Sequence, residues 1–138
     1  MPDAEAIAVS AGGVIAGAGL AELAARTARR LPAEHHVGLY AAGLALAAAI
    51  YPAARRRWRL DRQSAGELAG LIGYGAASVL AARRPQPRAN RLLAAGWASN
   101  ALFDAAHGHD ENSRLPRWYP AVCAGYDLVI CGHLARAA

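Results

Sequence analysis

The arginines of this chain are confined to short clusters, and this distribution constrains the fold more than any other feature. The chain has no lysine, and its fifteen arginines are Arg26, Arg29, Arg30, Arg55, Arg56, Arg57, Arg59, Arg62, Arg83, Arg84, Arg88, Arg91, Arg114, Arg117 and Arg136. Between clusters lie arginine-free segments of roughly 16–25 residues, the length that a helix needs to cross the hydrocarbon core of a bilayer. The pattern predicts a polytopic membrane protein.

The pI near 9.9 alone would suggest a nucleic-acid partner,. A nucleic-acid-binding helix would place arginine along one face, at intervals of three or four residues. Here the arginines are instead segregated into short clusters with long arginine-free segments between them, so we expect no nucleic-acid partner. The hydrophobic content is 55%, yet the mean hydropathy is only +0.13, because much of the apolar content is alanine and glycine.

The length of 138 residues fits one domain, and we predict a single integral membrane domain over residues 1–138,. The expected fold is all-α, a bundle of four to five transmembrane helices at about residues 5–25, 37–54, 65–82, 91–107 and 118–136,. No cleavable signal peptide is apparent, so we expect the first helix to direct the chain to the cell membrane.

Two local patterns support these helices. Gly13 and Gly17 give the first helix a face of small residues for close helix contact, and Gly66 and Gly70 repeat that spacing,. Ser64 followed by Glu67 has the spacing of a capping box, which predicts the start of the third helix,.

A soluble helical bundle is the alternative, because the last three predicted helices are short and rich in alanine. Such a bundle needs polar residues at every third or fourth position of each helix. The segment 37–50 carries only Tyr40 as a polar side chain, which favours the membrane. The arginine balance does not choose an orientation, since the two sets of loops carry nearly equal numbers.

The fourth predicted helix carries a stripe of functional side chains. Trp97, Asn100, Asp104 and His107 follow spacings of three, four and three. At about 100° per residue they fall within an arc of roughly 80° on one face. A charge at membrane depth costs several kcal/mol unless it faces a partner or a wet cavity, so the stripe predicts a site. Alternatively, Asp104 and His107 lie near the helix end and reach interfacial water.

Asp127 lies about midway along the last predicted helix, with Tyr126 beside it and Cys123 and Cys131 one turn away on either side. Burial favours the protonated form of a carboxyl group, which is the form that a general acid requires. The alternative is a structural hydrogen bond between two helices. The two cysteines are about 12 Å apart on such a helix, too far for a disulfide.

Metal and cofactor sites have little support. His107, His109 and Asp104 are the residues that would hold a metal if one binds. His109 belongs to a polar loop, where solvated side chains are common, so we predict no metal. The chain has no phosphate-binding glycine loop, nucleophile elbow or CxxC motif, and we expect no cofactor,.

Between Gly96 and Leu128 the chain carries Gly96-Trp97, Asn100, Phe103-Asp104, His107, Pro116-Arg117-Trp118-Tyr119-Pro120, Cys123 and Tyr126-Asp127. This pattern resembles a family of small bacterial integral membrane proteins of unknown function. The family pattern has Gly-Trp, a histidine three residues later, Trp-Asp, a histidine pair, and later a cysteine and an aspartate in the last helix. This chain departs from it at Asn100, Phe103 and Gly108. The resemblance implies membrane topology but no reaction. A looser likeness, of architecture only, is to membrane-integral terpene cyclases.

The first functional hypothesis is a cofactor-independent enzyme, of isomerase, cyclase or dehydratase type, acting on a lipophilic small molecule. The candidate catalytic residues are Asp104, Asp127, His107 and Glu67. The candidate substrate-binding residues are Trp97, Asn100, Phe103, Tyr119, Cys123 and Tyr126. The second hypothesis is a proton- or cation-coupled transporter or channel, which at this length we expect to be a homo-oligomer. The third is a structural or accessory membrane protein whose polar residues bind helices together.

Overall fold

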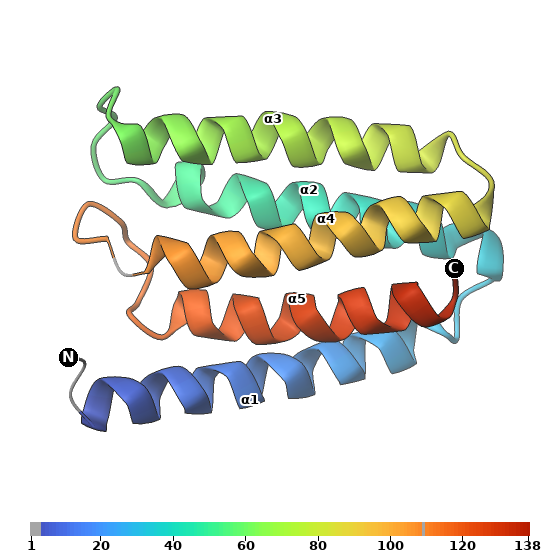
Figure 1. Cartoon of the computed structure of the whole chain (residues 1–138), viewed down its shortest axis with the longest axis horizontal. Helices are drawn as coiled ribbons and strands as arrows, with labels where there is room; N and C mark the ends of the chain where they lie inside the picture. The colour runs from blue at the N-terminus through green and yellow to red at the C-terminus, as the bar shows by residue number, and fades with distance from the viewer. Residues whose placement is uncertain (1–3, 109) are drawn as a thin grey trace.

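The computed structural model describes residues 4–108 and 110–138, which form an up-and-down bundle of five α-helices (Figure 1). The helices are α1 (Ala4–Ala28), α2 (His36–Ala54), α3 (Arg62–Ala82), α4 (Gln86–His107) and α5 (Tyr119–Arg136), and a short 3-10 turn, η1 (Ala33–His35), precedes α2. The predicted all-α bundle is confirmed.

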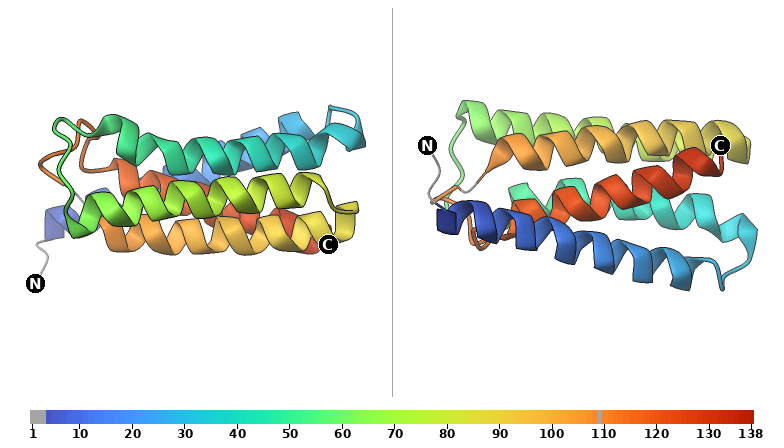
Figure 2. Two further views of the ribbon diagram at one scale, coloured as in Figure 1. Left: turned by 90° about the horizontal axis from the view of Figure 1, so that it is seen from above. Right: turned by 60° about the horizontal axis from the view of Figure 1, so that its bottom comes forward.

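Consecutive helices run in opposite directions, so the connections gather at two ends (Figures 1 and 2). The α2–α3 connection, residues 55–61, and the described part of the α4–α5 connection, residues 108 and 110–118, form what we call the Arg55 end. The α1–α2 and α3–α4 connections, residues 29–35 and 83–85, form the Arg29 end. Helix α5 lies between α1 and α4, while α2 packs on α3 and α4. This order makes α4 and α5 the central helices.

Glycines bring α1 and α5 into close contact. A Cβ atom on Gly17 would overlap the backbone of Val122, and one on Gly125 would overlap the carbonyl group of Val14. The predicted small-residue face of α1 is therefore a helix contact, as is typical of close packing between membrane helices. The same spacing in α3 does not mark a close helix contact at Gly66, because a Cβ atom there would meet no described atom within 4 Å.

Large apolar side chains cover the outside of the bundle. Three helical segments among the described residues are long and apolar enough to cross a membrane: α1, η1 with α2, and α3. Only 17%, 28% and 17% of their most apolar windows are buried inside the bundle. Exposed large hydrophobic residues also occur on α4 and α5, at Leu102 (72% exposed) and Leu128 (56%). An apolar surface of this extent is expected for a bundle surrounded by lipid rather than water.

Two helix starts differ from the sequence prediction. Helix α3 is capped by Asp61, whose side chain accepts a hydrogen bond from the backbone N–H of Ser64. The capping box therefore joins Asp61 to Ser64 instead of Ser64 to Glu67, which leaves the Glu67 carboxylate free for another role. This backbone hydrogen bond lowers the pKa of Asp61. Helix α4 begins at Gln86, before the predicted start, because Pro87 fits in a first turn that needs no N–H from it,.

Candidate acid–base site

The predicted stripe on α4 faces the interior of the bundle. The residue exposures of Trp97, Asn100 and Asp104 are 3%, 3% and 1%, and the His107 side chain is 6% exposed. The i, i+3, i+4 spacing places all four on the side of α4 that packs against α2 and α5. Asp104 therefore does not reach interfacial water, in contrast to the alternative considered from the sequence.

Asp104 on α4 and Asp127 on α5 form a buried carboxyl pair. Asp127 is 2% exposed, and its Oδ2 accepts a hydrogen bond of 2.7 Å from the Asn100 amide nitrogen. The carboxyl groups of Asp104 and Asp127 interact directly with each other. With both groups ionised, neither oxygen of Asp104 has a hydrogen-bond donor of good geometry among the described residues. A proton shared between the two carboxyl groups would supply the missing hydrogen bond, because a protonated carboxyl group is a donor.

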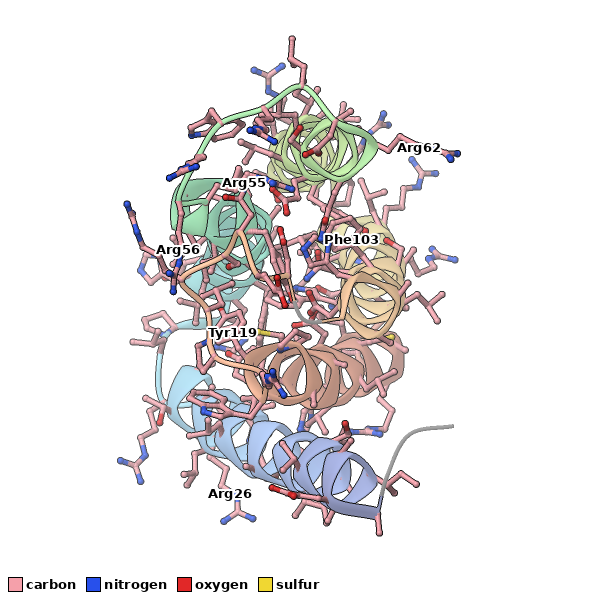
Figure 3. All side chains as sticks on the ribbon, turned by 90° about the vertical axis from the view of Figure 1, so that its left-hand side faces the viewer. Arg26, Arg55, Arg56, Arg62, Phe103 and Tyr119 are labelled. Atoms are coloured by element: carbon pink, nitrogen blue, oxygen red, sulfur yellow. The ribbon has the colours of Figure 1, made fainter. Side chains whose placement is uncertain are left out.

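An aromatic wall closes the Arg55 side of the pair. The Tyr51 ring centroid lies 4.4 Å from that of His107, 5.7 Å from Phe103 and 6.1 Å from Tyr119. The Tyr51 hydroxyl also interacts with Asp104. Figure 3, viewed toward the Arg55 end, shows Phe103 and Tyr119 directed into the bundle from opposite sides of this interior. Tyr51 thus lies between the carboxyl pair and the loops.

Cys123 and Tyr119 complete the surroundings of the pair from α5. The Cys123 thiol interacts with the Tyr119 hydroxyl and with both carboxyl groups, Asp104 and Asp127. Cys123 lies one turn before Asp127, so the helical repeat places the two side chains on the same face. The two cysteines are both free thiols.

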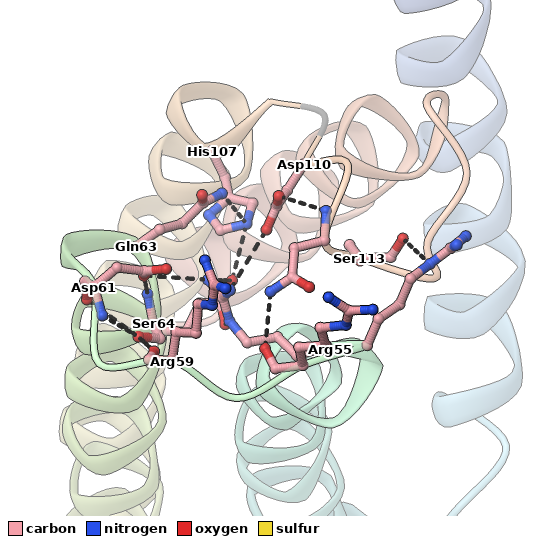
Figure 4. Close-up of polar contacts among 12 residues, drawn as sticks. Arg55, Arg59, Asp61, Gln63, Ser64, His107, Asp110 and Ser113 are labelled. Atoms are coloured by element: carbon pink, nitrogen blue, oxygen red, sulfur yellow. Dashed lines mark hydrogen bonds and ion pairs between the residues drawn. The ribbon is translucent and has the colours of Figure 1, made fainter.

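A second buried polar cluster lies at the Arg55 end, just outside the aromatic wall (Figure 4). The Arg55 guanidinium donates to both Glu67 carboxylate oxygens, at 2.6 and 3.1 Å. His107 Nε2 lies 3.1 Å from Glu67 Oε1, and Asp110 Oδ2 lies 3.6 Å from Arg55 Nη1. The side chains of Arg55 and Glu67 are only 1% and 2% exposed. This cluster therefore holds charges away from water, where each needs a partner.

The charge of Arg55 is maintained by its acidic neighbours. Burial by itself would lower the pKa of Arg55, but the Glu67 hydrogen bonds and the charges of Glu67, Asp61 and Asp110 outweigh it and raise the pKa. The guanidinium therefore stays protonated at every physiological pH,.

Backbone contacts between two loops hold this cluster in place. The Arg56 N–H donates to the Asn112 carbonyl at 2.8 Å, and the Arg114 N–H donates to the Ala54 carbonyl at 2.9 Å. The Asn112 side-chain amide adds a 2.8 Å bond to the Arg57 carbonyl. These bonds pair the α2–α3 connection with the α4–α5 connection in a short antiparallel bridge. The pairing turns Arg55 inward, while Arg56 and Arg57 stay exposed.

The two polar clusters meet at His107 and Tyr51. A cavity of about 10 Å³ lies beside Tyr51 and His107, lined by Tyr51, His107, Gly108, Asp110, Ser113, Leu115, Pro116 and Pro120. This volume corresponds to about one water molecule. The structure therefore joins the carboxyl pair to the loops through side chains and one small cavity, and the pair itself is closed to larger molecules.

Some predicted site residues lie elsewhere. Trp97 and Tyr126 contact each other, with ring centroids 5.9 Å apart, and pack with the apolar core. His109, one of the residues considered for a metal, lies outside the described residues. Within 4–108 and 110–138 there is no group of three His, Cys, Asp or Glu side chains placed to hold a metal ion.

Tyr51 and Arg55 are the site residues that the sequence did not indicate. Tyr51 follows the apolar run of α2 directly, so its position at a helix end resembled that of an interfacial aromatic residue. Arg55 begins a cluster of similar arginines, and no local signal distinguishes the buried one. Its separation of twelve residues from Glu67 crosses a loop, so helical periodicity gave no indication of the pair.

No protein-family model matches the chain, and neither a curated protein nor a solved structure shows significant similarity to it. The resemblance of residues 96–128 to a membrane-protein family accordingly stays a prediction. Function has to be inferred from the geometry of the site.

Proposed function

We propose that the chain is a multi-pass membrane enzyme that uses Asp104 and Asp127 as general acid and general base on a lipophilic small molecule. The observation that carries the proposal is the direct interaction of two buried carboxyl groups from adjacent helices. Ionisation of both groups of an interacting buried carboxyl pair is unfavourable, so a pair of this kind can hold one proton between its two groups. One group is then an acid and the other a base, without any cofactor.

The distribution of ionisable groups supports an active site over a transport pathway. The buried acidic side chains Glu67, Asp104 and Asp127 lie from the middle of the bundle toward the Arg55 end. On the Arg29 side of Asp127 the core includes the apolar residues Leu44, Leu93 and Ile130, and no acid is buried there among the described residues. A pathway for protons or cations requires ionisable groups through the full depth of the membrane. The confinement of the buried acids to one half therefore favours chemistry at a fixed place.

The surrounding residues fit roles in proton transfer. Asn100 donates a hydrogen bond to Asp127, and Tyr51 contacts His107 with its ring and interacts with Asp104 through its hydroxyl. The aromatic rings of Phe103 and Tyr119 contact Tyr51 and are groups that can stabilise positive charge developing on a substrate,. Protonation of a substrate at one atom and removal of a proton from another gives isomerisation or cyclisation. Protonation of a hydroxyl group, with loss of water, gives dehydration.

Access for a substrate requires movement of the aromatic wall, because the present cavity beside Tyr51 is only about 10 Å³. The small size of this cavity also favours a second candidate function, a structural role. In that role the Asn100–Asp127 hydrogen bond would hold α4 against α5. The two candidates make opposite predictions for isosteric variants. Loss of a carboxylate abolishes turnover in an enzyme, whereas it changes only stability in a structural protein.

The test compares wild type with Asp104→Asn and Asp127→Asn, each purified in detergent and reconstituted in lipid nanodiscs. Each sample is incubated with organic extracts from source cells that lack the gene, and products are followed by mass spectrometry. We expect wild-type protein to convert a lipophilic compound to an isomer or to a product lighter by one water. Both variants should lose at least about 100-fold in rate, the usual contribution of a general acid or base.

Glu111→Gln is the matched control, since Glu111 is an exposed acidic residue of the α4–α5 connection. It should convert the same compound at the wild-type rate. Conversion at the wild-type rate by both aspartate variants would refute acid–base catalysis by this pair. Absence of any conversion by folded wild-type protein would favour the structural role.

A further inference from the structure

A second cavity lies at the Arg29 end, far from the carboxyl pair. Its volume is about 170 Å³, well above the ~10–15 Å³ that one water needs,. It opens between α1, α2, α4 and α5, and the side chains that line it include Arg29, His36, Tyr40, Gln86, Asn90 and His133. All of these carry hydrogen-bond donors, and none is acidic.

The charge at this end of the bundle is strongly positive. Eight of the fifteen arginines lie here, Arg26, Arg29, Arg30, Arg83, Arg84, Arg88, Arg91 and Arg136. Among the described residues, two acids lie at this end. Glu22 is already engaged, because it accepts from Arg26 at 3.3 Å and lies 2.8 Å from His133 Nε2, and Glu34 of η1 is exposed. Neither carboxylate lines the cavity, so no described acidic side chain neutralises the positive charge around it. Such a concentration of cations attracts anions toward the opening.

The donors that remain available converge from separate elements. Arg29 is an exposed guanidinium just after α1, and its Nη2 lies 3.9 Å from Glu22 Oε1. Tyr40 is half-buried on α2. Asn90 on α4 uses its amide for the Ala137 carbonyl at 2.8 Å, which leaves a second amide hydrogen for a ligand,. Gln86 and His36 are the first residues of α4 and α2, so the positive ends of two helix dipoles meet here,.

We propose that this cavity binds a phosphate group, carried either by the head group of an anionic lipid or by a free phosphate. A planar guanidinium with hydroxyl and amide donors is the combination that phosphate oxygens favour. The exposed leucines Leu20 and Leu23 of α1 and Leu39 of α2 lie toward the same end and offer apolar surface for the chain of a lipid. The proposal is independent of the function assigned to Asp104 and Asp127.

The test measures thermal unfolding of the full chain in an uncharged detergent, with phosphatidylglycerol and inorganic phosphate as separate probes. A ligand that binds the folded state raises the unfolding midpoint in a concentration-dependent way. We expect Arg29→Gln to raise the half-maximal probe concentration about tenfold, the equivalent of one charge-assisted hydrogen bond. Tyr40→Phe should raise the half-maximal probe concentration about fivefold without a change of charge. This variant provides the test if Arg29→Gln does not fold.

Arg57→Gln is the charge-matched control, since Arg57 is exposed at the opposite end of the bundle. A phosphatidylglycerol response that depends on Arg29 but not on Arg57 assigns a lipid head group. An equal dependence with inorganic phosphate assigns a free phosphate. The proposal is overturned if neither probe stabilises the wild type, or if the binding variants respond in the same way as Arg57→Gln.

Discussion

The ion pair of Arg55 and Glu67 gives the sharpest test of the structure, through the substitution Glu67→Gln. Glutamine keeps the shape of the side chain but removes its charge and one of the two hydrogen-bond acceptors of the bidentate contact. The guanidinium is then left 1% exposed, with Asp110 at 3.6 Å and Asp61 at 4.0 Å as its remaining acidic neighbours. Removing one partner of a buried pair costs about 3–5 kcal/mol. Because two weaker acidic neighbours remain, we expect the lower value, about 3 kcal/mol.

The measurement is unfolding by titration with a denaturing detergent, with Glu111→Gln as the same substitution at an exposed site. That control should change the unfolding free energy by less than about 0.5 kcal/mol. The double variant Arg55→Met with Glu67→Leu removes both charges, so it should be less destabilised than Arg55→Met alone. If the single variants cost under about 1 kcal/mol and their effects add, the pair is solvated and the buried cluster described here is wrong.

The remaining predictions concern the helix contacts and the cap. Gly17→Leu should separate α1 from α5 and lower the midpoint of detergent-induced unfolding, because a side chain there overlaps the α5 backbone. Gly19→Leu should have little effect, since no described atom lies within 4 Å of its Cβ position. Asp61→Ala should destabilise the start of α3 above about pH 4, as followed by circular dichroism. Because Ser64 lowers the pKa of Asp61, the stabilisation is present above the unfolded pKa and is lost as pH falls through the folded value,. A pH-independent difference between Asp61→Ala and wild type would contradict that assignment.

The sequence by itself determined the helical architecture and one face of the site. The arginine clusters bound apolar runs long enough to cross a membrane, and a run of that length has to satisfy its own backbone hydrogen bonds as a helix. The spacing of Asn100, Asp104 and His107 placed them on one stripe, because the helical repeat is a local property. Asp127 stood out because a carboxyl group in the middle of an apolar run is costly without a partner.

Only the tertiary structure decided which residues the stripe meets. The contact between Asp104 and Asp127 depends on the packing of α4 beside α5, and Tyr51 joins them because α2 packs on α4. Arg55 is buried and its neighbours in the cluster are not, because loop pairing across more than fifty residues turns one side chain inward. The spacing of Glu67 from Ser64 suited a helix cap. In the structure Glu67 pairs with Arg55 instead, because a buried guanidinium without an acidic partner is energetically costly,. Such long-range pairings carry no local signal, so the sequence indicated the candidate residues of α4 and α5 while the fold selected the residues that they contact.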